Sequence, residues 1–197
     1  MVMQEAHHGN PLSALPPRSY PGVYPWHMNA TIPSTPTSHA GTANPLSAAW
    51  LLVKTPDSAA LLIALLTLGL VFFPHGAQLA LGWFGGYGFS GTMGFFTGML
   101  HIPAPLAFLA IAAEFAGSLG LIFGLLGRVA AFGIAANMIV AIVMVHAANG
   151  FFMNWYGTQK GEGFEYHLLA LGLALIVILY GAGKASIDRF ITTRRSA

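Results

Sequence analysis

Long apolar runs separated by short polar or glycine-rich stretches dominate the chain between residues 56 and 183. Each run is close to the ~20 residues with which an α-helix crosses the hydrocarbon core of a bilayer, and none shows the period of two of a β-strand. Pro74 interrupts the first run, where it predicts a kink rather than an end. The predicted helices cover about residues 57–81, 104–126, 129–149 and 164–182. The pattern predicts an all-α fold, an integral membrane four-helix bundle, since backbone groups cannot stay unpaired in lipid.

The first 55 residues contain no such run and differ in composition. Eight of the twelve prolines fall within the first 45 residues, and proline lacks a backbone N–H and fixes φ. We therefore expect a Pro-rich, largely non-helical N-terminal extension over residues 1–55, a bundle domain over 56–183 and a basic C-terminal tail over 184–197. The composition of the extension favours a disordered segment; the alternative is a strap ordered by a partner and anchored by Tyr20, Tyr24 and Trp26.

Composition narrows the class of protein further. Charged residues are 7% of the chain and hydrophobic residues 55%, whereas soluble domains carry about 25% charged residues. This excludes a soluble enzyme, and the near balance of eight basic and six acidic residues gives no basic patch for a nucleic acid. The chain has no cysteine, so a redox role would need a bound cofactor or a partner.

The distribution of Lys and Arg predicts the orientation in the membrane. With four spans both termini lie on one side, together with the short turn near residue 128. Seven of the eight basic residues then share that side: Arg18, Lys54, Arg128, Lys184, Arg189, Arg194 and Arg195. Lys160 is alone on the opposite side. Because positive charge is enriched in cytoplasmic loops, both termini are expected in the cytoplasm.

Glu114 lies near the middle of the second apolar segment. An ionisable group at membrane depth is costly, and such groups commonly mark functional sites. The functional interpretation is a carboxylate that handles protons or binds a ligand. The alternative is a neutral carboxylic acid that is hydrogen-bonded between helices.

A histidine is followed three residues later by an amide near the outer ends of the first and third segments. The pairs are His75 with Gln78 and His146 with Asn149. A spacing of three places both members of each pair on one helix face. Two matched pairs predict that these side chains meet in the outer half of the bundle.

The fourth segment enters from the same outer side with Glu165 and His167. Four packed helices can bring such groups together in one polar pocket, with Glu114 below it. We predict catalytic roles for Glu114 and His146 and ligand binding by the others: His75, Gln78, Asn149, Glu165 and His167. The alternative is that each histidine reaches the interface and is hydrated there.

The predicted pocket fits a quinone, which needs an apolar slot and a few donors for its carbonyl oxygens. Glu114 and His146 would then act as acid or base. A haem, which uses axial ligands such as histidine, also remains open. A di-metal carboxylate centre needs two Glu-x-x-His motifs, which the segments lack, and no metal site is predicted.

Several stretches in this order over about residues 60–190 resemble the DoxX family of small bacterial inner-membrane proteins. They are Phe73-Pro-His-Gly-Ala-Gln, Ala113-Glu-Phe-Ala-Gly, Gly124-Leu-Leu-Gly-Arg-Val, Val145-His-Ala-Ala-Asn-Gly-Phe-Phe, the Phe164-Glu-Tyr start of the fourth segment and Gly181-Ala-Gly-Lys. The resemblance implies a four-helix protein of the bacterial inner membrane. Two features depart from the family: Gln78 stands where a lysine is frequent, and the Pro-rich extension is an addition that suggests a specific partner.

Family members are linked to thiosulfate:quinone oxidoreduction and to membrane complexes that handle oxidative or thiol stress. The resemblance thus implies a subunit of a quinone-linked redox complex, with other membrane or redox subunits as partners. Whether the chain is itself part of an enzyme stays open. The alternatives are a non-catalytic accessory subunit that stabilises a larger membrane complex and, less in keeping with four short spans, a small-solute transporter.

Overall fold

The computed structural model describes residues 45–194, and their side chains from residue 49 onward. These residues belong to one compact unit, Gly41–Ala197. Its helices are α1 (Pro45–Val53), α2 (Ala59–Leu81), α3 (Gly88–Gly94), α4 (Ala104–Phe123), α5 (Gly127–Ala141), α6 (Glu165–Tyr180) and α7 (Ile187–Arg194). No strand occurs within these described residues, so the all-α prediction is confirmed. Residues 1–44, with the proposed anchors Tyr20, Tyr24 and Trp26, lie outside the described part.

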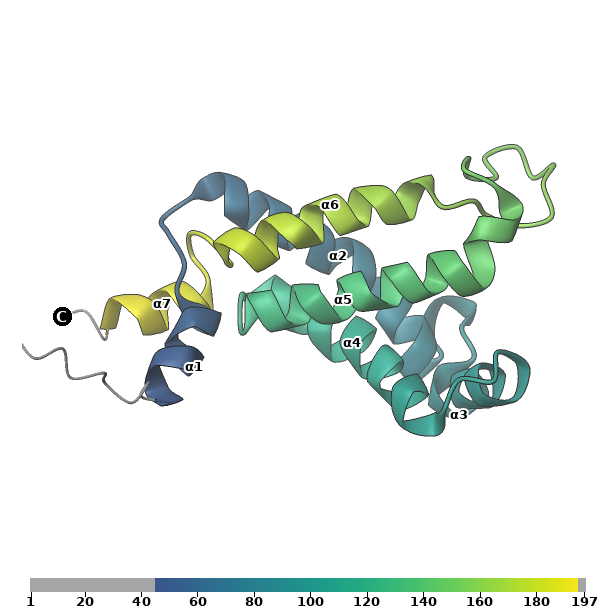
Figure 1. Cartoon of the computed structure of the whole chain (residues 1–197), viewed down its shortest axis with the longest axis horizontal. Coiled ribbons are helices and arrows are strands. Elements are labelled where there is room, and N and C mark those ends of the chain that lie inside the picture. The colour runs from purple at the N-terminus through teal and green to yellow at the C-terminus, as the bar shows by residue number, and fades with distance from the viewer. Residues whose placement is uncertain (1–44, 195–197) are drawn as a thin grey trace, which may run out of the picture. The chain divides into compact units, whose positions relative to one another are not determined.

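Helices α2, α4, α5 and α6 form the predicted four-helix bundle (Figure 1). Among the described residues, three spans are long and apolar enough to cross a membrane: Ala59–Leu81, Ala104–Phe123 and Gly127–Asn149. The last of these continues α5 through a π-turn (Ile142–His146) and a 3-10 turn (Ala147–Asn149). The fourth, α6, is apolar but has 16 residues, which is about 24 Å of helix. Helix α2 continues through Pro74 to Leu81, as the sequence predicts.

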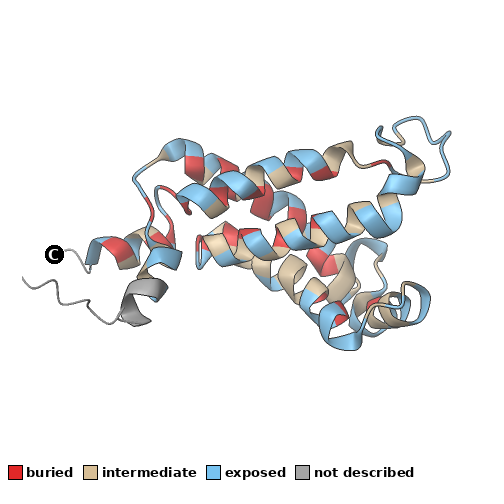
Figure 2. Cartoon of the chain, in the orientation of Figure 1, coloured by how far each residue is buried: buried red, intermediate tan, exposed pale blue. Residues whose placement is uncertain are grey.

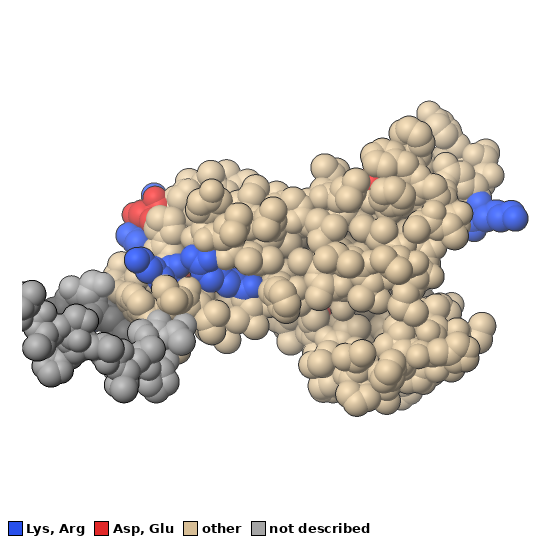
Figure 3. All heavy atoms as spheres, viewed as in Figure 1, with Lys and Arg blue, Asp and Glu red and all other residues tan. Residues whose placement is uncertain are grey.

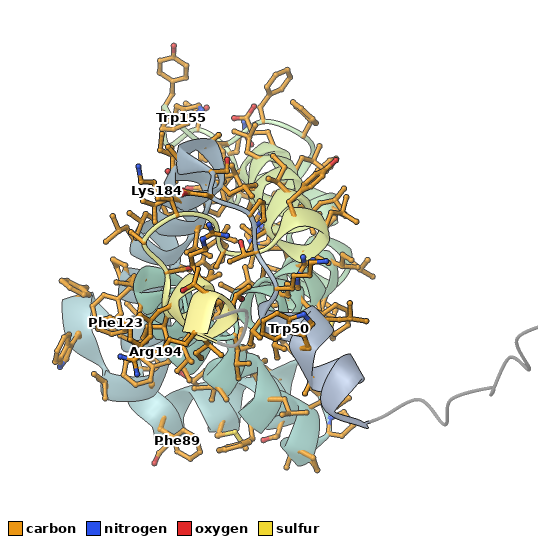
Figure 4. The ribbon with its side chains drawn as sticks, turned by 90° about the vertical axis from the view of Figure 1, so that its left-hand side faces the viewer. Trp50, Phe89, Phe123, Trp155, Lys184 and Arg194 are labelled. Carbon is orange, nitrogen blue, oxygen red and sulfur yellow. The ribbon has the colours of Figure 1, made fainter. Side chains whose placement is uncertain are left out.

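The core is a narrow apolar column between the four helices, and most of the apolar side chains lie outside it (Figure 2). Leu65, Leu121 and Ile134 are fully buried, whereas Leu169 on α6 is 72% exposed. Seen along the bundle, Phe89 and Phe123 are among the side chains on the outer surface (Figure 4). So large an exposed apolar surface is suited to lipid rather than to water.

Two glycines of α2 bring its backbone against that of α4. A Cβ atom added at Gly76 would lie 2.6 Å from the backbone carbonyl of Glu114, and one added at Gly69 would lie 3.0 Å from the backbone nitrogen of Ile122. Small residues let membrane helices approach this closely. The depth and position of Glu114 are therefore fixed by a backbone contact between α2 and α4.

The end of the predicted extension is helical and contacts the bundle. The hydroxyl of Thr55, which is buried, accepts a hydrogen bond from the backbone N–H of Gly183 (2.6 Å). The guanidinium of Arg128 at the start of α5 donates to the carbonyl oxygens of Ile178, Leu179 (2.8 Å) and Lys54 (3.1 Å). The segment before α2 is thereby joined to α5 and to the last turn of α6.

The loops at the opposite end are folded as well. The predicted connection over about residues 82–103 contains α3 and a π-turn (Phe95–Met99), and the hydroxyl of Thr92 donates to the carbonyl of Leu79 (3.0 Å). The connection before α6 folds back on itself and is closed by backbone hydrogen bonds. One of them runs from the N–H of Glu165 to the carbonyl of Phe151 (2.9 Å). Both loops thus cover the end of the bundle that carries most of the predicted site residues.

The Lys and Arg side chains of the described residues lie at the two ends of the bundle. On the face in Figure 3, Lys and Arg gather at the end formed by α1 and α7. The basic residues of the described part at this end are Lys54, Arg128, Lys184, Arg189 and Arg194, while Lys160 lies in the loop at the other end. The apolar band between the two ends matches the part of the protein that contacts the lipid bilayer.

Candidate functional site

Glu114 is in the middle of α4 and faces α5. The side-chain amide of Asn137 on α5 donates a hydrogen bond to the carbonyl of Ala110 (2.8 Å) and lies 3.5 Å from Oε1 of Glu114. The close contact with Gly76 fixes the backbone of Glu114 from the side of α2. A carboxyl group and a carboxamide therefore lie together at mid-depth, held by three helices.

Two cavities lie between α4 and α5. The larger has a volume of about 610 Å³ and an almost entirely apolar lining that includes Leu106, Leu109, Phe132 and Ala136. These four residues are exposed on the outer surface of the bundle, so the cavity opens toward lipid.

The smaller cavity has a volume of about 90 Å³, and Glu114 is part of its wall. It shares five lining residues with the larger cavity: Ile102, Ala110, Asn137, Val140 and Met144. The two cavities therefore adjoin. Together they lead from the lipid-facing surface to Glu114 and Asn137.

A group of aromatic and imidazole rings occupies the outer half of the bundle on the side of α6. The rings of His146 and His167 are 4.1 Å apart between centroids, and the ring of Tyr166 lies 5.6 Å from His167 and 6.4 Å from His75. Three predicted site residues, His75, His146 and His167, thus come together with Tyr166.

Two atoms of this group are buried without a hydrogen-bond partner: the hydroxyl of Tyr166 and Nδ1 of His167. Buried polar atoms are nearly always paired with protein or water, so such exceptions point to a functional role or to a small molecule that reaches them. By contrast, Nδ1 of His146 lies 2.8 Å from the carbonyl oxygen of Glu162 in the outer loop.

The other predicted ligand-binding residues contact the outer loops in this structure. The amide of Gln78 donates to the carbonyl of Phe84 (3.2 Å) and that of Asn149 to the carbonyl of Glu162 (3.1 Å). Oε1 of Glu165 accepts hydrogen bonds from the indole of Trp155 (3.2 Å) and from a neighbouring backbone N–H. Their role in ligand binding stays a prediction, and their observed contacts shape the loops.

The cavities also lie elsewhere than the polar pocket that the sequence predicts. Of the seven predicted site residues, only Glu114 lines either of these cavities, and it lines the smaller one. The rings of His146 and His167 are in contact with each other. In residues 45–194, no group of three or more His, Asp or Glu side chains is placed to hold a metal ion.

Two residues of the site were not predicted. Asn137 is a polar residue in the middle of the third apolar segment, and the reasoning that selects Glu114 would have found it. Tyr166 directly precedes His167, and nothing in the spacing shows that its ring, rather than a histidine, lies at the centre of the group.

Comparison with known proteins gives one family. No curated protein and no solved structure matches the chain. The DoxX family model matches residues 60–147, which cover α2, α4 and the third span as far as the π-turn, and include His75, Gln78, Glu114 and His146. The chain thus carries a DoxX domain over residues 60–147, within a bundle of helices that are apolar enough to span a membrane.

Proposed function

We propose that the chain is a subunit of a quinone-linked redox complex in the bacterial inner membrane, and that it binds the quinone between α4 and α5. The observation that carries this proposal is the lipid-facing apolar cavity that leads to Glu114 and Asn137. A quinone has an apolar tail and a head group with carbonyl oxygens, which accept hydrogen bonds. The tail suits the walls formed by Leu106, Leu109 and Phe132, and the head group suits the two polar side chains.

The residues of the chain fit this ligand and its proton chemistry. A bound quinone accepts two electrons and two protons to give a quinol. Asn137 can donate a hydrogen bond to a carbonyl oxygen and orient the head group, and a protonated Glu114 can supply a proton at the oxygen nearest to it. The electrons come from a partner subunit, because the chain has no cysteine and thus no thiol chemistry of its own.

The distribution of charge supports an orientation with both termini in the cytoplasm. The basic residues at the end formed by α1 and α7 outnumber Lys160 at the other end, as expected for the cytoplasmic side. The ring group then lies in the half of the bundle toward the periplasm, with Glu114 at mid-depth.

This proposal is tested by calorimetry, which measures the binding of decylubiquinone to the full chain in lipid nanodiscs. Ala136→Phe fills the larger cavity and should weaken binding at least about tenfold, which is about 1.4 kcal/mol. Leu169→Phe, which adds a ring on the lipid-facing side of α6, is the matched control and should bind as wild type does. Equal affinities for all three proteins, or no binding by wild type, would overturn the quinone site and leave the accessory-subunit interpretation.

A further inference from the structure

Glu114 lies at mid-depth in the bundle and can supply a proton to a bound ligand repeatedly only if it regains one from water. We propose that Tyr166, His167 and His146 form a path for protons between Glu114 and the outer end of the bundle. The purpose of the path rests on the proposed function, in which Glu114 donates a proton, but its existence can be tested without any quinone.

The inner step of the path joins Glu114 to Tyr166. The ring of Tyr166 lies 6.4 Å from that of His75, and the next residue, Gly76, packs against the backbone of Glu114. The tyrosine hydroxyl is buried with no hydrogen-bond partner. A hydroxyl both accepts and donates a hydrogen bond, so the Tyr166 hydroxyl can take one proton and release its own. Its ring is held in place by stacking on Phe72, with 6.1 Å between centroids.

The outer step joins His167 to His146 and the loop. Their rings are in contact at 4.1 Å, and Nδ1 of the buried His167 has no hydrogen-bond partner. His146 is bound through Nδ1 to the carbonyl of Glu162, a residue whose side chain is exposed. The path therefore ends at a solvent-exposed loop.

Imidazole is suited to this task because it can bind a proton at one nitrogen while another leaves from the second nitrogen. The net result is that water at the outer end loses one proton and the carboxylate of Glu114 gains one. No electron moves, and each intermediate group returns to its neutral form. The other titratable groups next to this path include His75, which lies 6.4 Å from Tyr166, and the acidic residues Glu162 and Glu165 at its outer end.

The opposite direction is closed by apolar packing. Between Glu114 and the end formed by α1 and α7 lie Leu65, Leu68, Leu121 and Ile134, each at most 1% exposed. A buried hydroxyl on this side of Glu114, that of Ser118, donates its hydrogen bond to the carbonyl of Phe115 on the same helix (2.8 Å) and so does not extend a path toward α1 and α7. The outer route is therefore the one that the described side chains provide.

The test measures how fast the carboxyl proton of Glu114 exchanges with solvent. Infrared spectra of the full chain in nanodiscs at acidic pH should contain a protonated-carboxyl band that Glu114→Gln removes, which assigns it. After transfer to D2O, the shift of this band gives the exchange rate. Tyr166→Phe and His167→Phe should each slow exchange by at least about tenfold.

Tyr180→Phe is the matched control, because it removes a hydroxyl from the opposite end of α6, where Tyr180 is exposed. It should exchange as wild type does. Tyr166→Phe keeps the ring and its stacking, so its result stands even if His167→Phe does not fold. Exchange at the wild-type rate in Tyr166→Phe, or no carboxyl band at acidic pH, would overturn the path.

The two proposals fail in different ways. A protein that exchanges as predicted but does not bind decylubiquinone retains the path and loses the quinone site. A protein that binds decylubiquinone but exchanges equally fast in all variants retains the quinone site, with protons that reach Glu114 by another route.

Discussion

Glycine at position 76 determines where the carboxyl group of Glu114 lies. The backbones of α2 and α4 meet at this point, since any side chain on Gly76 would collide with the backbone of Glu114 and Phe115. The next residue toward the N-terminus, His75, belongs to the ring group around Tyr166. One glycine thus sets the distance between α2, which carries His75 of the ring group, and α4, which carries Glu114.

Gly76→Ala should lower the stability of the folded protein by about 1–3 kcal/mol, the usual cost of overpacking, because the new methyl group forces α2 away from α4. Thermal unfolding of the protein in detergent measures the effect. Gly172→Ala is the control, since a Cβ at this helical position on α6 would meet nothing within 4 Å. Equal unfolding temperatures for Gly76→Ala and wild type would show that the two helices separate without cost.

At the level of the elements, the start of α5 is capped from a distant part of the chain. Asp188 at the start of α7 accepts hydrogen bonds from the backbone N–H groups of Leu126 and Gly127, both at 2.8 Å. Leu126 has a φ of 51°, a left-handed conformation that is uncommon for such a residue. Burial raises the pKa of Asp188, and the two N–H donors and Arg128 oppose this rise.

Asp188→Ala should destabilise the protein by about 2 kcal/mol, because it leaves two N–H groups at the start of α5 without an acceptor. The same unfolding measurement applies. Asp57→Ala is a suitable control: Asp57 is 59% exposed and lies 3.8 Å from Arg189, and exposed ion pairs contribute little. If both variants lost the same small amount, Asp188 would not act as a cap.

At the scale of the whole molecule, hydrogen bonds rather than the Pro-rich composition mark where the N-terminal extension ends and the compact unit begins. The compact unit begins at Gly41. Within it, the carbonyl of Lys54 accepts from Arg128, that of Val53 accepts from Thr192, and Thr55 binds Gly183. The sequence pattern assigns residues 45–55 to the Pro-rich extension. In the structure, the end of this segment is instead joined to the rest of the compact unit by these three hydrogen bonds.

Removal of residues 1–40 should leave the unfolding temperature of the bundle unchanged, because this Pro-rich segment contains no apolar run that could form a core. Removal of residues 1–56 should lower it, because the acceptors for Arg128 and Gly183 are lost. Native mass spectrometry of both truncated forms, extracted from the host, also shows whether a redox partner remains bound. If removal of residues 1–40 alone already lowered the unfolding temperature, a boundary near residue 41 would be wrong.

Part of the site follows from local sequence and part does not. Glu114 stands out because a carboxyl group in an apolar segment is conspicuous, and the matched His–amide pairs placed His75 and His146 at one end of the bundle. The same pattern could not show that Gln78, Asn149 and Glu165 contact the loops. Spacing along a helix gives the relative direction of two side chains, but not the direction of either toward a neighbouring helix.

The sequence by itself determined the fold class, the membrane setting and the limits of the four spans to within a few residues. These depend on the length and hydropathy of contiguous segments. Tertiary structure decided that the cavity lies between α4 and α5, that Tyr166 and Asn137 belong to the site, and that α1 and α7 join the bundle end. These features depend on the rotation and separation of packed helices, which contacts such as that of Gly76 with Glu114 fix only when all four helices are in place.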